Sequence, residues 1–394
     1  MARTLTSEPV FFSAVPNILT FSGMKIGSKG TYVMAAVCQH DSALYEETTY
    51  YYTNTAGQVI FDVSPFLTRA FDKLFKNPDI VAGPGGISSG RIFLYNLLEL
   101  SIEATVTDAI DGQTYTDNYE NMYVSYGGVA LSEITKWRRE LELSGGITSA
   151  TRMLTRATSF EVNTYLPSAF YFRPLVVGAI GSPAFSLVHA ETGVSAGDWP
   201  LGLGGAYAIS VLAASAVVGG NGNYLWYRKT GQGASTKQIY KIKINNDATI
   251  LDKIKAGICV YLRWLNSLGG FSYGLFKVKN ENRTVAANVI GKQYTTIVPE
   301  GLVNQKDFQI LSKKAVKTLS IGIGQVGWDR MYDLLDLLTS IDVCAYSIYE
   351  AGDVDRTNNW TPVLVSGSAS PRRDYNYNDF SCEITFPELF TQKR

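Results

Sequence analysis

The sequence predicts a mainly β protein of β-sandwich or split-barrel domains with a few short helices. Residues 256–276 read as two strands around a glycine-containing turn, a typical hairpin pattern. Strand-like runs rich in Val, Thr and Tyr recur along the rest of the chain. Of its 394 residues 46% are hydrophobic and only 18% charged, against about 25% charged in typical soluble proteins. A chain of this composition is globular and buries much of its surface, in its own core or against neighbours.

The hairpin is the clearest element. Ile258, Val260 and Leu262 alternate with other residues that are themselves mostly apolar, and residues 266–270 form the turn. Because both faces of the strands are nearly apolar, we expect the hairpin to lie in the interior. Arg263 is its single charge, so it is predicted to be a scaffold element.

Three domains are expected from the length and the pattern. Residues 1–145 are predicted to form a β domain with two short helices, and residues 146–245 a Gly-rich β insertion or second β domain. Residues 246–394 are predicted to form a C-terminal β domain with one helix.

The first domain begins with strands over residues 9–63. A helix then starts at Ser64, a predicted N-cap followed by a proline suited to the first turn. Its apolar residues recur at helical spacing over 66–75. Asp111 and Gly112 predict a hairpin turn, and Ser132 is expected to begin the second helix.

The middle region contains an uncharged run, residues 199–227. Its apolar core is too short and too Gly-rich for a membrane-spanning helix, so no membrane insertion is expected. Instead, Asn221 and Gly222 predict a hairpin that joins a strand near Tyr207 to a strand over 224–227. The N-terminus lacks the pattern of a signal peptide.

The C-terminal domain is predicted to continue from the hairpin with further strands over 282–299. A strand over 316–323 and a helix over 328–338 follow, and then three more strands. Four residues at i, i+3, i+4 and i+7 predict the apolar face of this helix: Trp328, Met331, Tyr332 and Leu335.

Charge and cysteine content narrow the function classes. Thirty-five basic and 35 acidic residues cancel without a clustered basic patch, which disfavours nucleic-acid binding. The cysteines are far apart and form no CxxC pair, so we expect buried thiols in a reducing compartment and no zinc site. They are Cys38, Cys259, Cys344 and Cys382.

Residues 322–327 match the dinucleotide motif GxGxxG between a strand and a helix. Three features count against a dinucleotide site. The strands that follow look antiparallel, and bulky Met331 and Tyr332 occupy helix positions that should be small. Glu350 lies farther along the chain than the acidic residue of the motif does. An ordinary strand-to-helix turn is the preferred interpretation.

Other candidate sites are weaker still. Residues 86–90 match GxSxG, but a flexible loop precedes Ser88 and His189 is the only histidine after it. With His40 as the only other histidine, no multi-histidine metal site is expected. Three further features favour structural roles: adjacent Glu46 and Glu47, loop residues Asp353 and Asp355, and the sugar-stacking candidates Trp199 and Trp226. We therefore predict no catalytic, cofactor-binding or metal-binding residue.

Several short motifs together resemble tail structural proteins of phages and prophages of the Bacteroides group, most closely the distal-tail or baseplate class. The motifs are VPNILTFSG, VIFDVSPFL, LRWLNSLGGFSYGLF, TLSIGIG, MYDLLDLLTS, DVCAYSIYE, NNWTPVLVS and FSCEITFPELFTQ. Residues 178–235 match no pattern of this class.

The resemblance implies a non-enzymatic virion protein, made in the bacterial cytoplasm, that forms a ring around the tail axis. A hexamer or a multiple of it is expected, in contact with other tail proteins through edge strands and loops such as 77–90 and 351–360. A carbohydrate-binding β-sandwich module of a receptor-binding phage component is the alternative. An enzyme that uses one of the glycine motifs is the third hypothesis.

Overall fold

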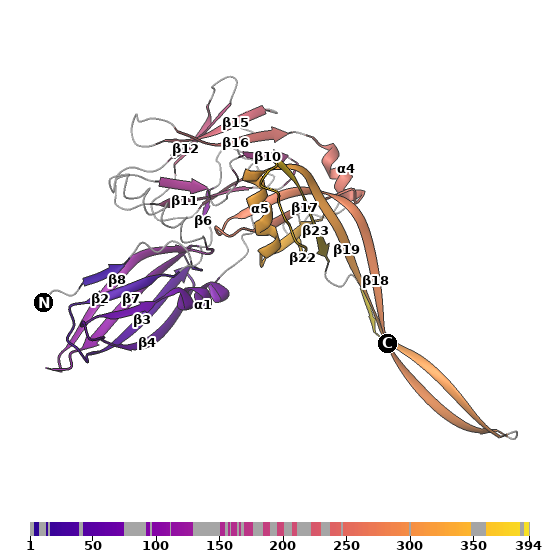
Figure 1. The fold of residues 1–394 in the computed structure, drawn as a ribbon, viewed down its shortest axis with the longest axis horizontal. Coiled ribbons are helices and arrows are strands. Elements are labelled where there is room, and N and C mark those ends of the chain that lie inside the picture. Colours follow the sequence, from indigo (N-terminus) through magenta and orange to yellow (C-terminus); the bar gives the residue numbers. More distant parts are fainter. Residues whose placement is uncertain are drawn as a thin grey trace. The chain divides into compact units, whose positions relative to one another are not determined.

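The protein is described by a computed structural model in which the chain divides into two compact units. Unit 1 comprises Met1–Asp247 and Asn266–Phe271, and unit 2 comprises Ala248–Leu265 and Ser272–Arg394 (Figure 1). The structure describes residues 4–7, 13–14, 16–38, 42–74, 92–94, 97–110, 112–128, 150–153, 157, 159–163, 165–166, 169–175, 184–189, 195–200, 207–210, 222–229, 237–245, 247–298, 301–347, 360–386 and 390–393. This part of the chain is mainly β, with several antiparallel sheets and short helices, which confirms the predicted fold class. The expected domain boundary near residue 145 and the helix expected from Ser132 lie outside the described residues.

Unit 1 begins with two sheets and a helix. The four-stranded sheet has the order β4-β3-β7-β8, and the three-stranded sheet has the order β1-β2-β5. All their pairings are antiparallel. The elements are β1 (Thr4–Ser7), β2 (Ile18–Ser22), β3 (Lys29–Cys38), β4 (Leu44–Tyr52), β5 (Val59–Asp62), α1 (Ser64–Leu74), β7 (Leu97–Thr107) and β8 (Thr114–Ser125).

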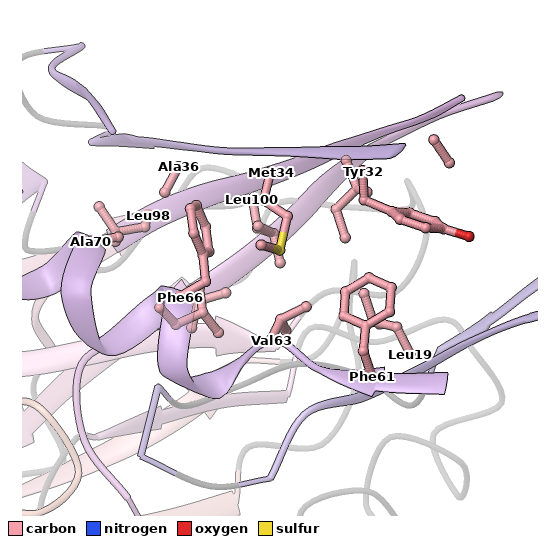
Figure 2. Packing of buried hydrophobic residues seen from close by; sticks show 14 of the residues in the cluster. Leu19, Tyr32, Met34, Ala36, Phe61, Val63, Phe66, Ala70, Leu98 and Leu100 are labelled. Atoms are coloured by element: carbon pink, nitrogen blue, oxygen red, sulfur yellow. The ribbon is translucent and has the colours of Figure 1, made fainter. Parts of the chain in front are cut away.

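A single apolar core joins these elements. Strands β3 and β7 alternate between buried and more exposed positions, so that each turns one face to the core. Figure 2 shows Tyr32, Met34 and Leu100 from these strands facing Phe61 and Phe66 from β5 and α1. The result is a sandwich in which the small sheet and the helix cover one face of the larger sheet.

Helix α1 forms where the sequence predicts it. Every described position of the predicted apolar face is buried: Phe66, Leu67, Ala70, Phe71 and Leu74. The carboxylate of Asp62 accepts hydrogen bonds from the N–H and the hydroxyl of Ser64, at 2.9 and 2.6 Å. The helix therefore includes Ser64, and Asp62 supplies the oxygen that caps its first turn.

The middle of unit 1 holds two further sheets. One has the order β6-β14-β11-β9, and the other has the order β10-β16-β15-β12-β13. All their pairings are antiparallel except that of β10 with β16. The strands are β6 (Ile92–Leu94), β9 (Ala150–Met153), β10 (Ser159–Asn163), β11 (Ala169–Leu175), β12 (Ala184–His189), β13 (Ser195–Pro200), β14 (Tyr207–Ser210), β15 (Gly222–Lys229) and β16 (Lys237–Asn245).

The hairpin predicted around Asn221 and Gly222 is wrong. Strand β14 pairs with β11 and β6, whereas β15 pairs with β12 and β16 in the other sheet. The two strands form where expected, but each finds partners far away in the sequence. A local turn signal cannot report such partners.

Unit 2 is an eight-stranded antiparallel sheet that nearly closes into a barrel. Its strand order is β21-β20-β17-β18-β19-β23-β22, and β24 pairs with β19. The two end strands, β21 and β22, are separated in the chain only by Val363, whose N–H bonds to the carbonyl of Val343. The strands are β17 (Cys259–Leu265), β18 (Phe271–Val298), β19 (Gly301–Gly327), β20 (Val343–Tyr346), β21 (Trp360–Pro362), β22 (Leu364–Ser366), β23 (Tyr377–Thr385) and β24 (Phe390–Lys393).

The central hairpin is buried on both faces, as predicted. Leu262 and Trp264 of β17 belong to the core of unit 2. On the opposite face Tyr261 and Arg263 are also buried. The short helix α4 (Thr249–Lys255) precedes this strand.

Helix α5 (Trp328–Thr339) packs on the core of this sheet through Met331, Leu334 and Leu337. Of the apolar face predicted for it, Met331 is buried and Trp328 packs against the core, whereas Tyr332 is 45% exposed. Asp333, which the apolar pattern does not include, is buried instead, so its carboxylate must be satisfied inside.

Asp333 is fully buried and is held by charged and polar partners. Its carboxylate accepts hydrogen bonds from the guanidinium of Arg330 at 2.6 Å and from the Ser272 hydroxyl at 2.5 Å. Arg330 also donates to the carbonyl of Tyr273, and the Trp264 indole donates to the Asp333 carbonyl at 3.1 Å. These bonds fix α5 to β17 and β18.

Candidate assembly surface

Strands β18 and β19 form one very long hairpin. They have 28 and 27 residues, and their register runs from Lys277 opposite Gly322 to Val298 opposite Gly301. The separate strands expected over 282–299 are thus one continuous strand. Only residues 299 and 300, which lie outside the described residues, separate the two strands in the chain.

The two ends of this hairpin have different surroundings. At its base, β17 lies beside β18, and β23 pairs with β19 from Thr318 to Gly327. β24 extends this support over residues 312–315. Beyond that point the two strands have only each other as strand neighbours within the described part of the chain. Figure 1 shows this ribbon running out past the rest of its sheet.

We call residues 289–310 the arm. Each of its strands contributes roughly ten residues, which corresponds to about 30 Å of length. An isolated two-stranded ribbon has no core and is at best marginally stable in water. The arm nevertheless has only four charged residues, namely Lys292, Glu300, Lys306 and Asp307. A ribbon of this length and low charge is the kind of element that is stabilised by contact with another molecule.

Ion pairs mark the base of the arm. The Glu281 carboxylate lies 2.8 Å from Arg283 Nε and 3.2 Å from Lys317 Nζ. Hydrogen bonds from Arg283 and Lys317 lower the pKa of Glu281, so the carboxylate is charged at neutral pH. These groups are open to water, so the cluster contributes little stability and serves mainly to keep this stretch polar.

A second exposed surface lies on the edge strand β4. Tyr50 and Tyr52 are 59% and 68% exposed on its outward face. Adjacent Glu46 and Glu47 lie on opposite faces of the strand, since the exposed and half-buried positions alternate along it. Glu47 forms a bidentate pair with Arg69, at 2.7 and 2.6 Å, and these hydrogen bonds lower its pKa. An edge strand with exposed tyrosines is a candidate contact surface.

Aromatic side chains also gather on one face of the unit 2 sheet. Tyr261 stacks on Tyr273 with ring centroids 6.1 Å apart, and Trp360 lies 5.2 Å from Tyr346. The guanidinium of Arg263 lies 4.8 Å from the centre of the Trp360 ring. Tyr261 is buried beneath its half-exposed neighbours, so it contributes to packing while the other rings form part of the surface.

The glycine motif at 322–327 occupies the strand-to-helix junction that the sequence predicts. Strand β19 ends at Gly327, which precedes the first turn of α5. The three strands that pair with β19 are all antiparallel to it, namely β18, β23 and β24. The dinucleotide fingerprint requires a parallel β-α-β unit, and this junction belongs to a different architecture.

Some of the remaining candidate site residues lie within the described part of the chain, and others do not. Residues 86–90, His40, Asp353, Asp355 and the loops 77–90 and 351–359 lie outside the described residues. His189, Trp199 and Trp226 fall on strands β12, β13 and β15. Within the described ranges, no three His, Cys, Asp or Glu side chains converge as a metal site would require.

The four cysteines are free thiols. Cys38, Cys344 and Cys382 are buried, as predicted, and Cys259 is half-buried. Burial raises the pKa of Cys344 to about 11 and that of Cys382 to about 12. In the described part of the chain, none of the helices is both long and apolar enough to cross a membrane.

Comparison with known proteins identifies no family. No protein-family model matches the chain, and no curated protein matches it. Among solved structures, a chain described as a marsupial T cell receptor aligns with 8% sequence identity, over 82% of this chain and 96% of that chain. The TM-score of 0.16 is too low to indicate a shared fold.

Proposed function

We propose that this chain is a structural protein of a phage tail tip or baseplate. In this proposal, copies of the chain assemble into a symmetric ring, a hexamer or a multiple of it, that connects the tail tube to host-binding components. The observation that carries the proposal is the arm, a two-stranded ribbon that pairs with no third strand in the described part of the chain. Such a ribbon is marginally stable alone, and contact with another molecule would supply the burial that stabilises it.

Such a contact is compatible with a ring. An arm on one copy that binds a different surface on the next copy makes a head-to-tail interface, which forms a ring when the rotation between copies closes and an open filament when it does not. An arm of about 30 Å can reach well across a neighbouring domain of ordinary size. The low charge of the whole chain, 18%, is consistent with extensive contacts between subunits.

The free cysteines agree with synthesis in the reducing cytoplasm of a host cell before incorporation into a virion. The exposed tyrosines of β4 offer a second contact surface, for another copy or for a different tail protein. The proposal thus gives separate surfaces to ring closure and to attachment.

Mass photometry and negative-stain microscopy of the purified full chain test this proposal. We expect closed rings of one subunit number, with their fraction rising with protein concentration because association follows mass action. A chain that stays a monodisperse monomer at high concentration would contradict it.

Glycan binding is the second candidate function. The half-exposed rings of Tyr273, Tyr346 and Trp360 form a surface on which a sugar ring could stack. A glycan array with the native chain and with Trp360→Ala tests this candidate. Binding that disappears in the variant supports it, and an array without any signal removes it.

A further inference from the structure

A hollow of 370 Å³ lies on unit 2, beside the glycine motif. It spans four strands, from Cys259 on β17 through Lys277 and Lys279 on β18 and Gly322 on β19 to Asp379 on β23. The proposed assembly function does not use this hollow. Two lysines in a shallow depression over glycine indicate a site for a negatively charged group.

The glycines are needed here for space. Neither Gly322 nor Gly324 has a positive φ, so the backbone alone would accept other residues. A Cβ at Gly322, however, would lie 2.7 Å from Lys279 Cε and 2.9 Å from both its Nζ and the backbone carbonyl oxygen of Phe380, which cannot move aside. The side chain of Lys279 lies across Gly322, at the edge of the hollow.

Both lysines are available for a ligand. Lys277 lies opposite Gly322 in the strand register. Burial raises the pKa of Cys259, and the positive charge of Lys277 partly opposes this increase. Neither Lys277 nor Lys279 forms an ion pair with any residue in the described ranges. Two ammonium groups that flank one depression repel each other, and a bound anion relieves this repulsion.

The acidic residue at the rim is held by the backbone. Asp379 Oδ1 accepts a hydrogen bond from the N–H of Gln325 at 3.1 Å. Gln325 has a φ of 54° and lies within the irregular stretch of the β19–β23 register between Ile323 and Val326. This bond directs one carboxylate oxygen of Asp379 to the backbone, and the hollow retains an excess of one positive charge.

We propose that this hollow binds the phosphate group of a small molecule, with Lys277 and Lys279 as its two charged ligands. Lysine binds phosphate as a compact point charge and does not require the planar geometry of arginine. The volume exceeds that of a single phosphate and leaves room for the group that carries it. The glycine motif then has a binding role without a nucleotide fold, because its small residues open the surface of an antiparallel sheet.

Competition labelling of the full chain tests this proposal, with inorganic pyrophosphate as the probe. Lysines are acetylated slowly, and the rate at each lysine is read by peptide mass spectrometry. We expect pyrophosphate to slow acetylation of Lys277 and Lys279 and to leave Lys73, an exposed lysine of unit 1, unchanged. Sodium acetate at the same ionic strength should protect neither site, because screening alone does not occupy the hollow.

Isothermal titration with matched variants completes the test. We expect a dissociation constant of about 1 mM for pyrophosphate. Lys277→Gln and Lys279→Gln should each weaken binding about tenfold, since each removes one charged contact. Lys73→Gln should bind like the native chain. Equal protection by acetate, protection of Lys73 to the same degree, or unchanged affinity in both site variants would overturn the proposal.

Discussion

Strands β18 and β19 lie in two very different environments along their length. At the base of the hairpin, Phe276 and Ile321 are fully buried in a sheet that nearly closes on itself. Further out, Val285 is 62% exposed, and beyond Asn288 the ribbon has no third strand in the described part of the chain. One pair of strands is therefore a core element at one end and an unsupported projection at the other.

The difference separates two sources of stability. The base is stabilised by burial within its own chain, so it should fold without a partner. The arm is instead a two-stranded ribbon of low charge, a kind of element that is marginally stable until it pairs or packs with something else. Assembly with another molecule is therefore the role that we propose for the arm.

The largest expected effect comes from removing the buried carboxylate of Asp333, near the base of the hairpin. Asp333→Ala leaves the guanidinium of Arg330 without its buried carboxylate, and we expect a loss of about 3–5 kcal/mol in the free energy of unfolding of unit 2. Urea unfolding followed by tryptophan fluorescence measures it. Asp374→Ala, at an exposed turn, is the matched control and should change stability by less than about 0.5 kcal/mol. Equal effects at both positions would contradict this account of α5.

The same substitution at both ends of the hairpin sharpens the comparison. Val326→Thr places a hydroxyl at a site on β19 that is 4% exposed, and we expect a cost of about 1–3 kcal/mol. Val285→Thr on β18 keeps a β-branched residue in an exposed position and should cost less than about 0.5 kcal/mol in the monomer. Comparable losses in urea unfolding would contradict the exposure of β18 at Val285, between the base of the hairpin and the arm.

High pH should lower the stability of unit 2, because its buried thiols lose their protons. The pKa of Cys382 is about 12 in the folded chain and near 9.0 when unfolded, chiefly because burial disfavours the thiolate. The folded state thus holds the proton more tightly, so stability is complete below pH 9 and falls as pH rises towards 12. Thermal unfolding between pH 8 and pH 11 should show a smaller loss in Cys382→Ala than in the native chain. An identical loss in both chains would exclude this thiol as a cause.

The smallest expected change concerns the core of unit 1, which is also buried within its own chain. The hydroxyl of Tyr32 is buried and finds no hydrogen-bond partner among the described residues. Tyr32→Phe removes the cost of that unsatisfied group, and we expect a gain of about 1 kcal/mol in the free energy of unfolding. Tyr50→Phe, at an exposed position of β4, should be neutral in the same denaturant titration. A destabilised Tyr32→Phe would show that the hydroxyl does have a partner.

The sequence predicts local elements well where the pattern is periodic. Helix α1 and the buried hairpin form as expected because their apolar spacing and turn residues act over a few positions. The partners of β14 and β15 could not be read, because pairing between distant strands leaves no local mark. The face of α5 was predicted wrongly at Tyr332, and buried Asp333 was missed because it appears in the sequence like any solvent-exposed charge.

The arm was only partly visible in the sequence. Val and Thr over 282–299 indicated strands, but nothing distinguished several short strands from one long one. Only residues 299 and 300 separate the two strands in the chain, and the sequence pattern did not identify them as the end of one long strand and the start of another. The hollow was hidden for another reason: the space over Gly322 depends on where Lys279 lies, and that placement follows from the three-dimensional register.

Replacement of the arm tests the central claim most directly. Asn288 and Ser312 are directly paired, so residues 289–311 can be replaced by an Asn-Gly turn that leaves β24 its partner strand. We predict that this variant keeps the unfolding free energy of the native monomer within about 1 kcal/mol and forms no rings in mass photometry. A variant that still assembles into the same rings as the native chain would contradict the assignment of the arm to assembly.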